Sequence, residues 1–193
     1  MVEPHPATTW ASEVLSFWFE TLSPADWFKP SAALDVDIAG RFAGLHANLA
    51  ARNPIDLAMT ADQALAAVIV LDQFPRNMFR GTARAFATDG LALHTARLAL
   101  AQGHDHQVET ARRGFLYLPF EHSEALDDQD TSVALITPLG DAEWTRYAIL
   151  HRDIIARFGR FPHRNAVQRR TSTPDEMAFL AAGDNAFGQS TAD

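Results

Sequence analysis

Three short polar clusters bring together residue types that could do chemistry. The first is DQFPRNMFR at residues 72–80, which follows one of the most apolar runs in the chain. The second is EHSE at 121–124, directly after FLYLPF, and the third is RFPHRN at 160–165. Glutamate and histidine are common general acids and bases, and arginine binds anions through its forked donors. If the clusters meet in space, they would form an acid–base site beside an anion clamp.

We predict roles for the members of these clusters on that basis. Glu121 and His122 would be the acid–base pair, because they follow a rigid apolar run that could hold them in place. The predicted ligand-binding residues are Asp72, Arg76, Asn77, Arg80, Arg160, His163, Arg164 and Asn165. The alternative is that the clusters are helix corners, with Ser123 capping the next helix and Glu124 favouring its positive end.

Asp72 lies on the apolar side of its helix, beneath Leu65, Val68 and Ile69. A buried carboxylate is costly unless it is paired, and arginine fits it best. Its possible partners are Arg76, Arg80, Arg160 and Arg164. Two interpretations stay open: an internal ion pair that holds a helix corner, or a carboxylate that orients an arginine for an anionic ligand.

Charge is unevenly distributed along the second half of the chain. Residues 121–130 hold five carboxylates and no arginine or lysine, whereas 152–170 hold six arginines and one aspartate. These segments either complement one another or supply an anion site. RNA binding by the arginines is a weaker possibility, because a net charge of −8 disfavours nucleic acid.

Other site chemistries are disfavoured. The chain has no cysteine, so disulfides and thiolate zinc sites are excluded. His104, Asp105 and His106 could chelate an ion, but we read them as an exposed loop and predict no metal and no cofactor. The glycine motif of nucleotide-binding folds is absent. With no signal peptide and no long apolar run, we expect a cytoplasmic protein without membrane association.

The elements that must position these clusters all read as helices. Apolar spacing, caps and breaks predict about eight: residues 8–20, 33–52, 60–74, 88–103, 108–118, 123–139, 141–158 and 173–183. Pro75 and Pro119 should each end a helix. We therefore predict an all-α stack of antiparallel helical hairpins, as one domain over residues 1–183 with a flexible tail at 184–193.

Three longer stretches carry a family resemblance. DQFPRNMFRGTARAFATD, FLYLPFEHSE, and FGRFPHRN followed by STPDEMAFL resemble the bacterial family catalogued as domain of unknown function 924. The resemblance extends from Val14 to about Leu180. It implies a helical bundle of the tetratricopeptide-like superfamily and carries no established activity.

Two functional hypotheses follow. The first is an interhelical pocket that binds a small anionic metabolite, with hydrolytic or transferase chemistry. The second is a tetratricopeptide-like interaction module whose motifs are structural. Its partner or homodimer surface would include the aromatic residues Phe17, Trp18, Phe19, Trp27 and Phe28.

Overall fold

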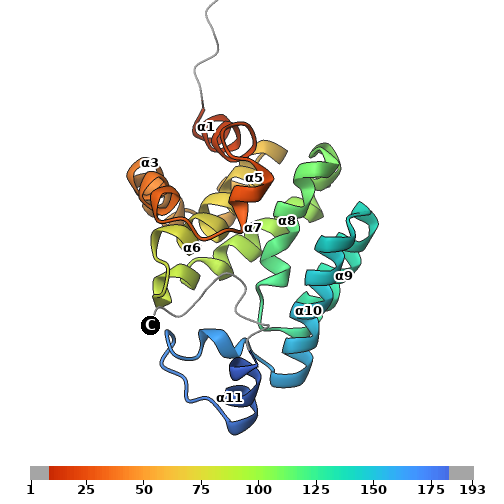
Figure 1. Ribbon diagram of the computed structural model, residues 1–193. Helices are drawn as coiled ribbons and strands as arrows, with labels where there is room; N and C mark the ends of the chain where they lie inside the picture. Colours follow the sequence, from red (N-terminus) through yellow and green to blue (C-terminus); the bar gives the residue numbers. More distant parts are fainter. Residues whose placement is uncertain (1–8, 183–193) are drawn as a thin grey trace, which may run out of the picture.

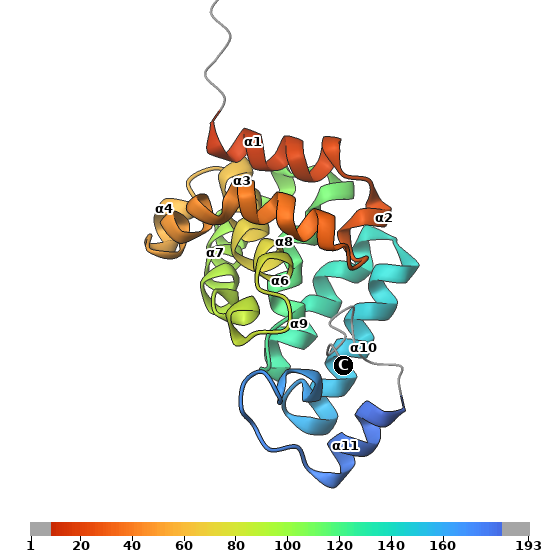
Figure 2. The ribbon, with the colours of Figure 1, turned by 60° about the vertical axis from the view of Figure 1, so that its left-hand side comes forward.

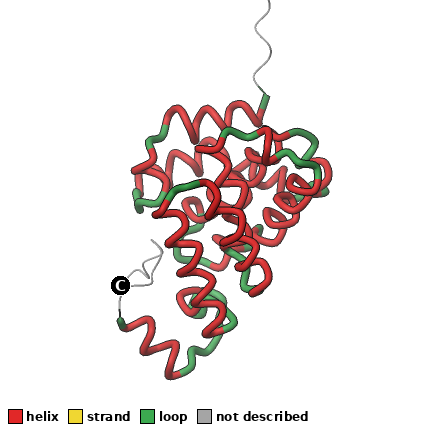
Figure 3. Tube along the Cα trace, turned by 90° about the vertical axis from the view of Figure 1, so that its right-hand side faces the viewer, coloured by secondary structure: helices red, strands yellow, loops and turns green. Residues whose placement is uncertain are grey.

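The computed structural model describes residues 9–182, and these residues form helices and loops with no strand (Figure 3). The prediction of an all-α fold is confirmed, although there are more helices than eight. The α-helices are α1 (Trp10–Ser16), α2 (Pro24–Trp27), α3 (Ala32–Ala50), α4 (Pro54–Leu57), α5 (Ala61–Val68), α6 (Phe74–Met78), α7 (Asp89–Ala101), α8 (Thr110–Glu121), α9 (Leu126–Ile136), α10 (Ala142–Phe158) and α11 (Pro174–Ala181). The predicted tail at 184–193 lies outside the described residues.

The helices form a body with a smaller C-terminal part at one end. α1 and α3 lie at the opposite end from α11 in both ribbon views, and α10 reaches from the body towards α11 (Figures 1 and 2). Within the body α5 packs against α1, α7 and α8, while α9 packs between α8 and α10. No helix within residues 9–182 is both long enough and apolar enough to cross a membrane.

The core is built around the chain from Ala64 to Pro75, which is buried throughout. The apolar run at residues 64–71 suits this position because neighbouring helices pack around it. A second, smaller apolar cluster joins Ile154 and Ile155 of α10 to Phe161. The C-terminal part therefore has apolar contacts of its own.

The prediction that Pro75 ends the preceding helix is wrong. α5 continues through a π-helical turn, Ile69–Gln73, directly into α6. In this turn the Phe74 amide donates to the carbonyl of Ile69, five residues back. Pro75 then lies in the first turn of α6, where a missing amide is tolerated. The chain is redirected by a widened turn and stays helical.

The prediction that a helix ends before Pro119 is also wrong. α8 contains Pro119 and continues to Glu121, with His122 as its C-terminal cap. Ser123 does not cap the next helix, because α9 begins after Ala125 and Ser123 donates to Asp128. The second polar cluster therefore sits at a helix end, as expected, but the helix reaches three residues further.

Candidate functional site

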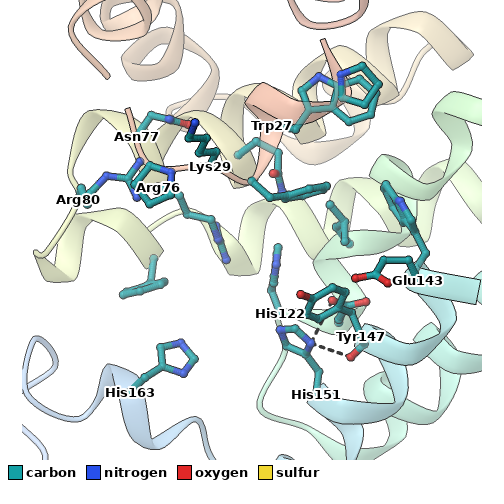
Figure 4. A pocket seen from close by; sticks show the side chains of 18 of the residues that line it. Trp27, Lys29, Arg76, Asn77, Arg80, His122, Glu143, Tyr147, His151 and His163 are labelled. Atoms are coloured by element: carbon teal, nitrogen blue, oxygen red, sulfur yellow. Dashed lines mark hydrogen bonds and ion pairs between the residues drawn. The ribbon is translucent and has the colours of Figure 1, made fainter. Parts of the chain in front are cut away.

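A cavity of about 530 Å³ lies where α2, α6, α8 and α10 meet the 3₁₀ turn Pro162–Arg164 (Figure 4). All three polar clusters contribute to its wall. Seven of the predicted site residues line it: Arg76, Asn77, Arg80, Glu121, His122, His163 and Arg164. Stretches separated by some forty residues in sequence thus meet at one cavity.

Two local features bring the clusters to this cavity. The π-helical turn before α6 carries Asp72, and such turns often occur at functional sites. α10 ends at Gly159, whose φ of 68° is left-handed and free of strain only for glycine. After Gly159 the chain turns back, which brings His163 and Arg164 to the cavity wall.

Asp72 and His122 form a buried pair behind the cavity wall. Nδ1 of His122 lies 2.8 and 2.9 Å from the two carboxylate oxygens of Asp72, which is fully buried. Burial raises the pKa of Asp72, but the charges of Arg76 and His122 and two hydrogen bonds lower it to about 2. Asp72 is thus ionised and accepts a hydrogen bond from Nδ1–H, so the basic nitrogen of His122 is Nε2.

The pKa of His122 lies below its usual value. Burial lowers it first, and the charge of Arg76 adds to this, against the opposing effect of Asp72. His122 is therefore neutral at neutral pH. A neutral imidazole oriented by a carboxylate is the arrangement of a general base.

Glu121 has the opposite behaviour to Asp72. Burial and the nearby negative charge of Asp72 raise its pKa to about 8, so it is protonated at neutral pH. Its Oε1 lies 3.1 Å from Nδ1 of His151, which also donates to the Tyr147 carbonyl at 2.9 Å (Figure 4). Burial, more than any neighbouring charge, holds the pKa of His151 well below its usual value. Glu121 and His151 are therefore both neutral and in contact.

Two arginines, Arg76 and Arg164, share the carboxylate of Asp89. Arg76 forms a bidentate pair with Asp89, both distances 3.0 Å, and its Nη1 lies 3.3 Å from Asp72. Arg164 donates to Asp89 at 3.3 Å and is stacked between the rings of Phe86 and Phe161, at 4.5 and 4.6 Å. Its Nε is buried without a hydrogen-bond partner among residues 9–182. Burial lowers the pKa of Arg164 to about 10, so it keeps its charge.

The remaining predicted residues have structural partners. Arg160 forms a bidentate pair with Glu176, and Asn165 donates to Ser172; neither lines the cavity. Asn77 and Arg80 do line it, and both also donate to Asp35 of α3. Of the four arginines considered for Asp72, the structure pairs it with Arg76. Glu124, for which a role at the positive end of the next helix was the alternative, pairs with Arg170.

Sequence reasoning missed several residues of the site. It did not place Asp89 or His151 in the site, although His151 is buried in the cavity wall. It also missed the aromatic residues Trp27, Phe28, Trp144 and Tyr147 in that wall. The apolar stripe of α10 contains Trp144 and His151, but nothing in its spacing distinguishes residues that line a cavity from residues that pack in the core.

Within residues 9–182 there is no group of three or more His, Cys, Asp or Glu side chains that could hold a metal ion. The loop with His104 and His106 is less exposed than expected. Asp105 is buried and accepts from Tyr117 at 2.9 Å, and His104 contacts the Ala58 carbonyl at 3.1 Å. These residues hold the loop in place.

The comparisons with known proteins agree with the resemblance seen in the sequence. A family model described as a bacterial protein of unknown function, DUF924, matches residues 14–184. A solved structure of a protein of unknown function from Agrobacterium tumefaciens is 42% identical, with a TM-score of 0.85. The similarity covers 90% of this chain and 97% of that one. No match was found among the curated proteins.

Proposed function

Because the chain belongs to this bacterial family of unknown function, we propose a function from the site alone: the cavity binds a small anionic metabolite and acts on it by acid–base chemistry. The observation that carries the proposal is the pair that buried Asp72 forms with His122 of the cavity wall. His122 would be the general base, and Glu121 would be the general acid.

The two roles follow from protonation states. A base needs a neutral imidazole with a lone pair towards the substrate, and Asp72 fixes the tautomer that leaves it on Nε2. An acid must hold a proton at neutral pH, which the raised pKa of Glu121 provides. Adjacent residues with these opposite properties suit hydrolysis or group transfer, because one group is deprotonated as another is protonated.

The preference for an anion rests on Arg76 and Arg164. The one carboxylate between them, Asp89, neutralises a single charge of the two. Asp72 is the second carboxylate that contacts Arg76, and it also contacts His122. Asp89 and Asp72 thus balance the two arginines, and because both arginines line the cavity, a bound anion would accept hydrogen bonds from their guanidinium groups.

The interaction-module hypothesis has less support. Phe17 and Trp18 are buried, while Phe19 and Trp27 are packed edge-on against Phe115 of α8. Most of the aromatic residues assigned to a partner surface therefore belong to the core. Tetratricopeptide-like packing, a cytoplasmic location and a homodimer stay predictions.

The test is a ligand screen followed by a turnover assay. Phosphorylated and carboxylated metabolites are screened by thermal shift, and those that raise the melting temperature are incubated with the protein and followed by NMR. His122→Ala should keep binding and lower turnover by ~10²–10⁴-fold, the range of general acid–base catalysis. His106→Ala is the control, because His106 is 79% exposed and lies outside the cavity wall. Equal turnover by His122→Ala and the wild type would refute the catalytic role.

A further inference from the structure

The cavity has two chemically different ends, with His122 between them (Figure 4). Arg76, Arg80 and His163 lie on one side of His122 in this view, and Trp27 and Tyr147 lie towards the other. Phe28 and Trp144 line the cavity with these last two. A ligand that fills the cavity therefore meets cations at one end and aromatic rings at the other.

The aromatic end exposes apolar surface inside the cavity. Phe28 is stacked on Phe115 with 6.1 Å between ring centroids and an interplanar angle of 11°, yet it is 55% exposed. Trp144 meets the Phe28 ring edge-on at 5.9 Å. The rings are thus held rigidly by their neighbours while part of their surface stays open. Rigid apolar surface in a cavity is typical of a site that covers the flat part of a ligand.

The carboxylates near this end are already engaged. Asp141 accepts from the amides of Glu143 and Trp144 as the N-cap of α10, and Glu143 pairs with Arg146 at 2.9 Å. Both carboxylates already accept hydrogen bonds within α10, so the faces of the rings are the surface that this end offers to an uncharged ring.

The cationic end is pre-organised for an anion. Arg164 is only 6% exposed, and the rings of Phe86 and Phe161 fix the plane of its guanidinium group. Its Nε is a buried donor with no partner among the described residues. Because Arg164 lines the cavity, its fixed guanidinium group is in place for the anionic group of a ligand.

We propose that the ligand joins a flat apolar ring, as in an aryl phosphate or aryl carboxylate, to the anionic group that the proposed function requires. The inference rests on that function and adds the ring. In this binding mode the ring contacts Phe28, the anion contacts Arg164, and the atoms that link them lie beside His122.

The experiment compares matched ligands on the wild-type protein by calorimetry. The pairs are phenyl phosphate with inorganic phosphate and phenylacetate with acetate; phenyltrimethylammonium is the cationic counterpart. We expect the aryl member of at least one pair to bind about tenfold more tightly than its partner, because its ring leaves water. Phenyltrimethylammonium should not bind.

Two variants separate the ends of the cavity. Phe28→Ala should abolish the advantage of the aryl ligand and leave the small anion unaffected, whereas Arg164→Gln should weaken both. Met59→Ala is the control for removing an exposed apolar side chain outside the cavity. If a small anion binds but the aryl ligand gains nothing, the inference of a ring fails and the proposed anion site stands. If none of the four anions binds, the proposed function fails as well.

Discussion

Asp72 and Glu121 are buried carboxyl groups of the same site with opposite protonation states. Asp72 has cationic and hydrogen-bonding partners in Arg76, His122 and Gln73, which outweigh its burial. Glu121 faces the neutral His151 and the negative charge of Asp72, so nothing offsets its burial. Divergent pKa values of this kind distinguish the acid from the ionised partner in known active sites. Here the difference arises from which side chains each carboxyl contacts.

Glu121→Gln should reverse part of a pH-dependent loss of stability. The folded-state pKa of Glu121 is about 8 and its ordinary value is 4.5, so the folded state binds the extra proton between these values. Its contribution to the free energy of unfolding therefore falls by about 1.4 kcal/mol per pH unit as the pH rises through that window. Glutamine resembles the protonated acid and does not titrate. In urea denaturation, the free energy of unfolding of the variant should therefore rise relative to that of the wild type from pH 5 to pH 8.

The matched control is Glu143→Gln, which changes an exposed glutamate on α10. Its difference from the wild type should stay nearly constant over the same pH range, because exposed pairs contribute little. A difference for Glu121→Gln that also stays constant would mean that Glu121 titrates near its ordinary value in the folded protein.

At the scale of helices, α8 and α10 approach closely at Gly114. A Cβ atom placed there would lie 2.2 Å from a ring carbon of Trp144. Because Trp144 also lines the aromatic end of the cavity, this contact links helix packing to the shape of the site. Only a residue without a side chain fits between the helix and the indole.

Gly114→Ala should therefore destabilise the fold, by about 1–3 kcal/mol as in other overpacked cores. This would occur although alanine is intrinsically the better helix former, by about 1 kcal/mol. Gly44→Ala in α3 is the matched control, since a Cβ there meets no atom within 4 Å and should stabilise the protein. Thermal unfolding of the two variants measures both changes in stability. A stabilised Gly114→Ala would contradict the close approach.

The helices also show where sequence reasoning succeeds and where it fails. The cap at Thr173 and the left-handed Gly159 are local signals, and the helices they bound were predicted within a few residues. Pro75 and Pro119 were misread because a π-helical turn and a buried helix end depend on tertiary packing. Asp89 was missed for a similar reason, since its partner Arg164 comes from 75 residues further along the chain.

At the scale of the whole molecule, the cavity is completed by the C-terminal part. Residues 159–182 carry His163 and Arg164 and pack on α10 through the apolar cluster of Ile154, Ile155 and Phe161. Glu124, just after α8, connects this part to the body. It accepts from Arg170 at 2.7 and 3.0 Å and from the Phe161 amide at 2.8 Å. The position of Arg164 thus depends on Glu124.

Glu124→Ala should loosen the C-terminal part and leave the body intact. Three hydrogen bonds are lost, so amide hydrogen exchange should accelerate across residues 160–172 but not in α5 or α7. Anion binding should weaken at the same time, because Arg164 moves with this segment. Glu109→Ala, which removes an exposed pair with Arg112, is the control. Unchanged exchange in 160–172 would mean that the apolar contacts of Phe161 suffice to hold the segment, and that Glu124 has no part in completing the cavity.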